Sequence, residues 1–273
     1  MLEKNILSNV VAAKSWPNIK VDTHILNSVS YLPITNKAIT SIKILATDEI
    51  MVDLAQITNP RLQALAKFDP IYQNDFPEYS QVRTGIYERL RLMLEILPAN
   101  VGIAYFEGLR PLSIQKKYFD KKFLETLAII KEPDIAYAQT CISVSPYINN
   151  IPVHSTGAAI DIHLFTINTN GTKELLDLGK FDTIFGDNLQ QQTFAENLSQ
   201  KQQNNRLLLL NATAKAGLIN YGYEWWHYSY GDKVWAHVTN APHAFYDIYP
   251  GPDLDILKIT YADFMASMSK TTI

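Results

Sequence analysis

The sequence predicts an α+β fold in which helices flank a central antiparallel sheet. Segments with the three- and four-residue apolar spacing of helices occur in the same chain as short β-branched and aromatic runs. Two of those runs are followed by dipeptides that turn hairpins, Asn170-Gly171 and Gly231-Asp232. The helices and strands do not alternate as βαβ units do, so a parallel α/β sheet is not expected.

Three segments are predicted to be helices. In residues 81–97 the apolar side chains recur at helical spacing, and Pro98 stops the run. A second helix is expected over 112–131, because Pro111 suits the position where a helix begins. A third is expected over 205–218.

Strands are predicted where β-branched and aromatic residues gather between turn signals. Residues 60–80 and 133–152 each contain three prolines and are expected to be irregular. Two short runs near the N-terminus, 41–46 and 49–54, fit edge strands or an N-terminal extension. The remaining expected strands are 100–107, 158–167, 173–178, 223–230 and 234–238.

Composition excludes several classes of protein. The 273 residues are 47% hydrophobic and 19% charged, which suits a packed core and argues against disorder. A net charge of −3 lacks the basic footprint of a nucleic-acid-binding protein. No stretch approaches the roughly 18 apolar residues of a membrane helix, and Ser8 and Asn9 interrupt the apolar run at the N-terminus. We expect a cytoplasmic protein, with a periplasmic location left open; the oligomeric state cannot be read from the sequence.

One histidine and one aspartate stand out in the segment HSTGAAID, as His154 and Asp161. Their spacing of seven would put them on opposite faces of a regular strand, so they can converge only if the chain turns between them. Gly157 permits such a turn. An imidazole and a carboxylate are two of the three protein ligands that a catalytic zinc site uses.

The segment EWWH offers a third ligand, His227, and a base, Glu224. Their spacing of three again requires a bulge or turn if both side chains are to share a site. Trp225 and Trp226 are expected to wall the pocket, and burial there would raise the pKa of the glutamate. A glutamate that accepts and returns a proton benefits from that shift.

Other candidates have simpler interpretations. The remaining histidines, His24, His163, His237 and His243, are interpreted as structural or surface residues, and the lone Cys141 as a small buried hydrophobic side chain. The motifs HExxH, GxSxG, GxxxxGK[ST] and GxGxxG are missing.

Four ordered motifs together resemble the D-alanyl-D-alanine dipeptidases, the VanX group of the zinc D,D-peptidase family. They are FEGLRP at 106–111, HSTGAAID at 154–161, FDTIF at 181–185 and EWWHYSYGDKVWA at 224–236. The resemblance covers about residues 80–240 and implies a Hedgehog/D,D-peptidase-like fold. It further implies one Zn²⁺ per chain bound by His154, Asp161 and His227, with Glu224 as the base and Arg110 facing the developing oxyanion.

Two further assignments implied by the resemblance concern the substrate and Arg110. Asp182 would receive the ammonium group of a dipeptide, and Glu107 would orient Arg110. Pro152 stands where the family pattern has a serine, and proline lacks the hydroxyl. The resemblance therefore implies the zinc chemistry but no serine contact to substrate at this position.

The resemblance implies a zinc peptidase that hydrolyses D-alanyl-D-alanine, or a similar short dipeptide, by metal-activated water. Two alternatives stay open: a D,D- or L,D-carboxypeptidase acting on peptidoglycan stem peptides, and a non-catalytic zinc-containing module that binds cell-wall peptides. The expected organisation is an N-terminal extension of unknown role over residues 1–45, followed by the peptidase domain over 46–273.

Overall fold

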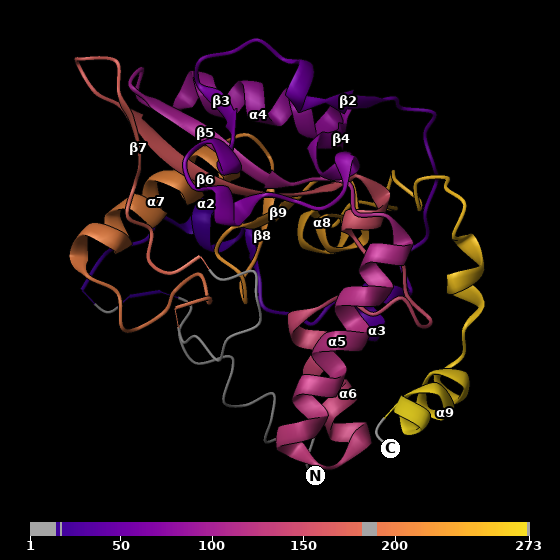
Figure 1. Cartoon of the computed structure of the whole chain (residues 1–273). Helices are drawn as coiled ribbons and strands as arrows, with labels where there is room; N and C mark the ends of the chain where they lie inside the picture. The colour runs from indigo at the N-terminus through magenta and orange to yellow at the C-terminus, as the bar shows by residue number, and fades with distance from the viewer. Residues whose placement is uncertain (1–14, 17, 182–189, 272–273) are drawn as a thin grey trace.

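A mixed sheet crosses the centre of the computed structural model, which describes residues 15–16, 18–181 and 190–271 (Figure 1). Among these residues the sheet has seven strands in the order β1-β8-β9-β6-β5-β3, with β7 also paired to β6. Its strands are β1 (Val29–Ser30), β3 (Leu62–Ala64), β5 (Val101–Glu107), β6 (Ala159–Ile167), β7 (Lys173–Leu175), β8 (Ile219–Tyr221) and β9 (His227–Ser229).

The middle of the sheet is antiparallel, as the sequence predicts. Strand β6 pairs antiparallel with β5, β7 and β9, and β9 pairs antiparallel with β8. The two edge strands, β1 and β3, instead run parallel to their neighbours β8 and β5. Each edge strand has only two or three residues, too few for an alternating pattern to reveal it.

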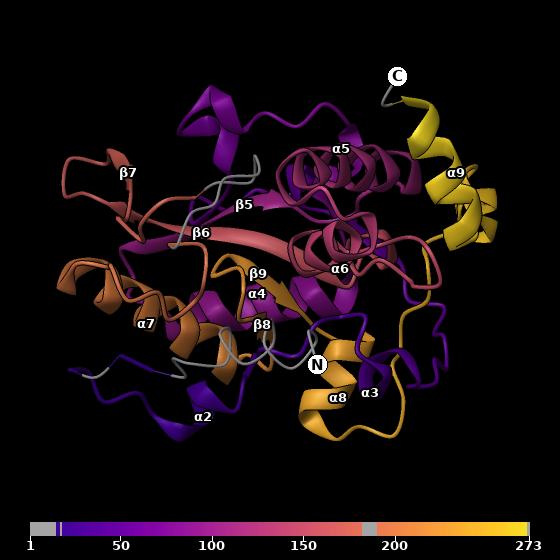
Figure 2. The ribbon, with the colours of Figure 1, turned by 90° about the horizontal axis from the view of Figure 1, so that it is seen from below.

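Helices lie on both sides of this sheet, so the predicted α+β class is confirmed. Helices α4 and α5 lie on opposite sides of β5 and β6 in both views (Figures 1 and 2). The α-helices are α2 (Thr23–Leu26), α3 (Lys37–Thr40), α4 (Thr84–Ile96), α5 (Leu112–Ile130), α6 (Pro133–Ser143), α7 (Gln200–Lys215), α8 (Lys233–Thr239) and α9 (Tyr261–Thr271). The 3-10 helices are η1 (Leu54–Gln56), η2 (Leu65–Lys67), η3 (Pro70–Tyr72), η4 (Pro77–Ser80), η5 (His154–Thr156) and η6 (Leu254–Lys258).

The three predicted helices exist, with shifted ends. Helix α4 begins at Thr84 rather than at residue 81, because Gln81–Arg83 form strand β4 and pair with β2 (Met51–Asp53). Helix α7 begins earlier than predicted, because Ser199 and Gln202 form a capping box. The predicted return strand over 173–178 is shorter and ends at Leu175.

Three predictions of local structure are wrong. Residues 60–80, expected to be irregular, include strand β3 and three 3-10 helices. Residues 133–152 are not a continuous loop, since Pro133 occupies the first turn of α6, where its missing N–H costs nothing. Residues 234–238 form a helix rather than a return strand. Asp232 caps α8 by accepting a hydrogen bond from the Trp235 N–H at 2.7 Å, so Gly231-Asp232 begins a helix and does not turn a hairpin.

Three hydrophobic clusters stabilise the fold, and the smallest lies around Val153 and Tyr221. The largest one joins the sheet to α4 and α7, and includes Ile103, Leu164 and Leu209. The second lies among α5, α6 and α9, where Phe119 and Phe264 are fully or almost fully buried. Cys141 belongs to the second cluster, as the sequence predicts, and burial raises its thiol pKa to about 12. None of the helices in the described ranges has the length and hydrophobicity that a membrane crossing requires.

Candidate metal centre and catalytic cleft

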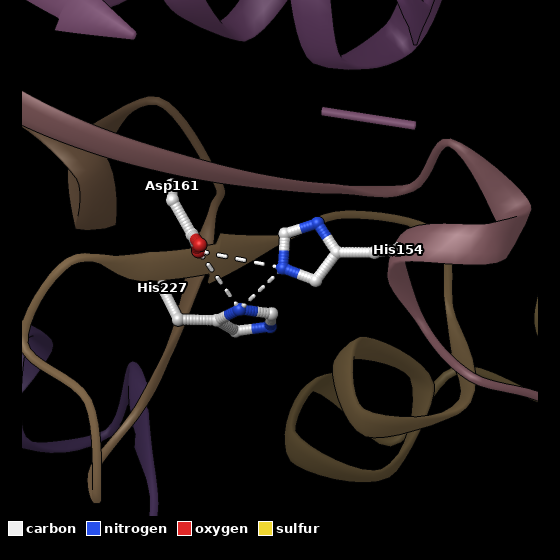
Figure 3. A group of neighbouring side chains, drawn as sticks. All are labelled: His154, Asp161 and His227. Carbon is white, nitrogen blue, oxygen red and sulfur yellow. Dashed lines mark hydrogen bonds and ion pairs between the residues drawn. The ribbon is translucent and has the colours of Figure 1, made fainter. Parts of the chain in front are cut away.

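Three side chains from two distant segments of the chain converge at one point (Figure 3). His154 Nε2 lies 3.0 Å from His227 Nδ1 and 3.4 Å from Asp161 Oδ1, and His227 Nδ1 lies 3.1 Å from the same carboxylate oxygen. All three residues are buried. The structure therefore brings together the three residues that the sequence proposes as metal ligands.

Local backbone geometry explains the convergence of His154 and Asp161. His154 begins η5, and Gly157 closes that turn with a φ of +73°, so the chain reverses before β6 begins. The left-handed conformation is the one that glycine adopts without a steric penalty. The turn that the sequence requires between the two residues is therefore present.

The register of the sheet positions His227 beside Asp161. Asp161 and His227 are directly opposed partners in the β6–β9 ladder, and Glu107 is opposed to Asp161 across β5–β6. Opposed residues of neighbouring strands point to the same side of a sheet. One rung of the sheet thus carries Glu107, Asp161 and His227 side by side.

The donor atoms fit a tetrahedral divalent cation. Ligand atoms about 2.0–2.2 Å from a tetrahedral zinc ion lie roughly 3.3–3.6 Å from one another. The observed distances of 3.0, 3.1 and 3.4 Å are close to this range or slightly below it. His154 Nδ1–H donates to the Gly108 carbonyl at 2.8 Å, which leaves its Nε2 lone pair directed at the other two side chains. Two imidazole nitrogens and a carboxylate oxygen form a donor set suited to zinc and to related transition metals.

The cluster is electrostatically prepared to hold a cation. Burial alone would raise the pKa of Asp161, but the imidazoles of His154 and His227 hold it well below its usual range. The carboxyl group is therefore ionised at neutral pH, even though its side chain is only 5% exposed. A buried carboxylate of this kind needs compensating positive charge.

Glu224 lies beside this cluster on the turn before β9. The His227 N–H donates to the Glu224 carbonyl at 3.2 Å, and this turn brings Glu224 Oε2 to 3.9 Å from His227 Nδ1. Burial raises the pKa of Glu224 to about 7. A carboxyl group with such a pKa can both accept and release a proton near neutrality.

Arg110 enters the site from the end of β5. Its Nε and Nη2 groups donate to the two carboxylate oxygens of Glu107 at 2.5 and 2.8 Å, and its Nη1 donates to Gln115 at 2.9 Å. Burial alone would lower the pKa of Arg110, but the Glu107 carboxylate raises it. These bonds use three of the five guanidinium N–H groups and leave two for a ligand in the cleft.

Sequence reasoning missed two contacts that hold the site. Gln115 also donates to the Ser145 carbonyl at 2.6 Å, and so joins Arg110 to the segment after α6. Its signal is a polar residue on the buried face of a predicted helix, where it is fully buried. The Gly108 carbonyl that orients His154 carries no side-chain signal.

The two tryptophans of EWWH have different positions. Trp226 lines the cleft, as expected, but Trp225 faces the opposite side and packs edge-to-face against His163. Its ring also lies 5.1 Å from the guanidinium of Arg206, which donates to the carbonyls of residues 178, 190, 192 and 193. The expectation that both rings wall the pocket is therefore wrong for Trp225, and His163 is a core residue.

The cluster opens into a cleft of about 600 Å³. Glu107, Arg110 and Glu224 line it together with the three clustered side chains. Helix α5 contributes Lys117 and Tyr118 to a second wall. Asp182, which the resemblance assigns to the substrate ammonium group, lies outside the described residues.

Comparison with known proteins agrees with this geometry. Residues 110–247 match the peptidase family described as D-Ala-D-Ala dipeptidase. A protein of Synechocystis sp. named D-alanyl-D-alanine dipeptidase is 30% identical over 186 residues, which cover 59% of this chain and 74% of that protein. The chain therefore belongs to the D-Ala-D-Ala dipeptidase family of metallopeptidases.

Proposed function

We propose that this protein hydrolyses D-alanyl-D-alanine, or a closely similar D-amino-acid dipeptide, with one zinc ion bound by His154, Asp161 and His227. The observation that carries the proposal is the convergence of these three donors within 4.8 Å of one another. The family match supports the class of reaction and of substrate.

In this proposal the catalytic base is Glu224. When bound, the zinc ion lowers the pKa of a coordinated water to about 7 and polarises the substrate carbonyl. Glu224 takes the proton of the attacking water and delivers it to the leaving amine. Its raised pKa, caused by burial, suits both transfers.

Arg110 would stabilise the negative charge that develops on the carbonyl oxygen. The two-pronged ion pair with Glu107 and the bond to Gln115 fix the plane of its guanidinium before the substrate arrives. A donor that is oriented in advance need not reorganise during the reaction, which is why such donors accelerate it. Glu107 is in this view an orienting residue for Arg110, and Asp182 receives the substrate ammonium group.

The test is release of D-alanine from D-Ala-D-Ala by the purified protein, before and after treatment with a chelator. We expect turnover that the chelator abolishes and that one equivalent of Zn²⁺ restores. L-Ala-L-Ala serves as the stereochemical control and should be hydrolysed much more slowly. Turnover that survives complete metal removal would refute the mechanism. A metal-loaded protein that binds the dipeptide without cleaving it would instead support the non-catalytic module.

One observation favours a second candidate, a carboxypeptidase acting on peptidoglycan stem peptides. The cleft of about 600 Å³ falls in the range that accepts drug-sized ligands and offers more room than two methyl side chains need. A peptide with a blocked N-terminus that ends in D-Ala-D-Ala distinguishes the two. A dipeptidase that binds the free ammonium group should leave the blocked peptide intact, whereas a carboxypeptidase should release its last D-alanine.

A further inference from the structure

Ile34 lines the catalytic cleft although it lies far outside the residues that match the family. The match begins at residue 110, and Ile34 belongs to the segment between β1 and α3. Its side chain is only 7% exposed and belongs to the cluster that contains Val153, Tyr221 and Val234, all of which also line the cleft. Val153 directly precedes His154, so this apolar wall adjoins the three converging side chains of the candidate metal centre.

Main-chain bonds hold the segment that carries Ile34 against β8. Strand β1 pairs in parallel with β8, and the Asn220 N–H donates to the Ser28 carbonyl at 2.8 Å. The Gly222 N–H donates to the Ser30 carbonyl at 2.7 Å. Because β8 leads directly into the turn that bears Glu224, this segment is fixed to the same element as the catalytic base.

Side-chain contacts add to these main-chain bonds. The Tyr223 hydroxyl donates to the Tyr31 carbonyl at 2.9 Å, and Lys233 Nζ donates to the Thr40 carbonyl at 2.7 Å. The Tyr31 ring lies so close to Gly222 that a Cβ atom there would come within 2.6 Å of it. The segment is therefore bound at both ends, at residues 28–31 and at Thr40, with Ile34 between the bonds.

We propose that residues 28–40 form a specificity wall of the catalytic cleft, and that Ile34 limits the size of the substrate side chain that fits beside the metal cluster. The inference rests on the proposed function and adds the N-terminal segment to it. Ile34, Ile142, Val153 and Val234 present aliphatic surface to the cleft, so the group they accept is apolar and uncharged. Shortening Ile34 enlarges that space without removing a polar contact.

The test compares substrates that differ only in side-chain size. For the wild type and for Ile34→Ala, kcat/KM is measured on D-Ala-D-Ala, D-Ala-D-Leu and D-Leu-D-Ala. We expect Ile34→Ala to raise the preference for one leucine-containing dipeptide over D-Ala-D-Ala by about tenfold or more, the scale of a few methylene groups in an apolar pocket. Ile34→Val should give a smaller shift in the same direction.

Ile39→Ala is the matched control. Ile39 lies in the same segment and cluster and is 2% exposed, but it does not line the cleft. It should lower the thermal midpoint as Ile34→Ala does while leaving the substrate preference unchanged. Unchanged preference in Ile34→Ala, or an equal change in Ile39→Ala, would overturn the inference alone. A wild-type protein that cleaves none of these dipeptides would refute the proposed function, and the inference with it.

Discussion

Glu224 and His227 lie at the two ends of one turn, with Glu224 Oε2 3.9 Å from His227 Nδ1. The Glu224 carboxylate lies near the candidate metal centre but is not one of its three converging donors. Glu224→Gln should therefore reduce kcat by roughly 10²–10⁴ while the protein still binds one zinc ion per chain. Turnover is measured with D-Ala-D-Ala and metal content by elemental analysis. Loss of the metal in this variant would mean that Glu224 is a ligand instead.

The raised pKa of Glu224 predicts how activity depends on pH. The base works only when it is deprotonated, so a pKa raised by burial to about 7 makes kcat/KM fall as the pH drops below that value. A bound cation favours the carboxylate and moves this acid limb to lower pH, never to higher pH. The residual activity of Glu224→Gln should lack the limb. A limb that persists unchanged in the variant would assign the titration to another group.

Arg110→Lys tests whether the planar guanidinium matters beyond its charge. Lysine cannot reproduce the two-pronged bond to Glu107 together with the bond to Gln115, so the cation would lose its fixed orientation. We expect kcat to fall on the order of 10²–10³, as for loss of an oxyanion donor. Arg91→Lys, at an exposed ion pair with Glu88, is the control and should leave kcat unchanged. A rise in KM alone would make Arg110 a binding residue.

Gly157→Ala should weaken metal binding through the backbone. An alanine at φ +73° costs roughly 1–2 kcal/mol, and its Cβ would also meet Met51 at 2.6 Å. The resulting shift of the turn would move His154 away from Asp161. Gly171→Ala is matched, with φ +83° and open space around the added atom. Competition with a chromophoric chelator should show weaker zinc binding for Gly157→Ala than for the wild type and Gly171→Ala. Equal zinc affinities for the two variants would mean that the turn at Gly157 does not affect metal binding.

His163 should make the fold sensitive to mild acid. Burial lowers its pKa to about 4, below the roughly 6.5 of an unfolded histidine, so the unfolded chain binds the extra proton first. The contribution of neutral His163 to the free energy of unfolding is therefore complete above pH 6.5. The free energy of unfolding falls by up to about 3 kcal/mol as the pH drops from 6.5 towards 4. Urea unfolding of the metal-free protein at several pH values measures this.

A matched pair isolates the contribution of His163. The difference in unfolding free energy between wild type and His163→Gln should change between pH 7.5 and 5. The same difference for Ile103→Val, which removes buried surface but no titratable group, should stay constant. Parallel pH profiles for the wild type and His163→Gln would contradict the prediction.

The sequence predicts the convergence of His154, Asp161 and His227, because short motifs identify these residues. Gly157 explains how His154 and Asp161 converge, and Pro111 marks the residue after which α5 begins. Helix α8 was misjudged because a glycine followed by aspartate can turn a hairpin or begin a helix, and the chain alone does not decide between them. Ile34 could not be placed, since its position depends on parallel pairing of β1 with a strand about 190 residues later.

The opposed positions of Asp161 and His227 tie metal binding to strand alignment. If β9 slipped by one residue along β6, His227 would point to the other side of the sheet and Tyr228 would take its place. A chain paired in that way would offer two donors instead of three. Metal added during refolding should therefore favour the correctly aligned sheet over its neighbouring registers, so the ion that we propose for catalysis would also stabilise the native strand register.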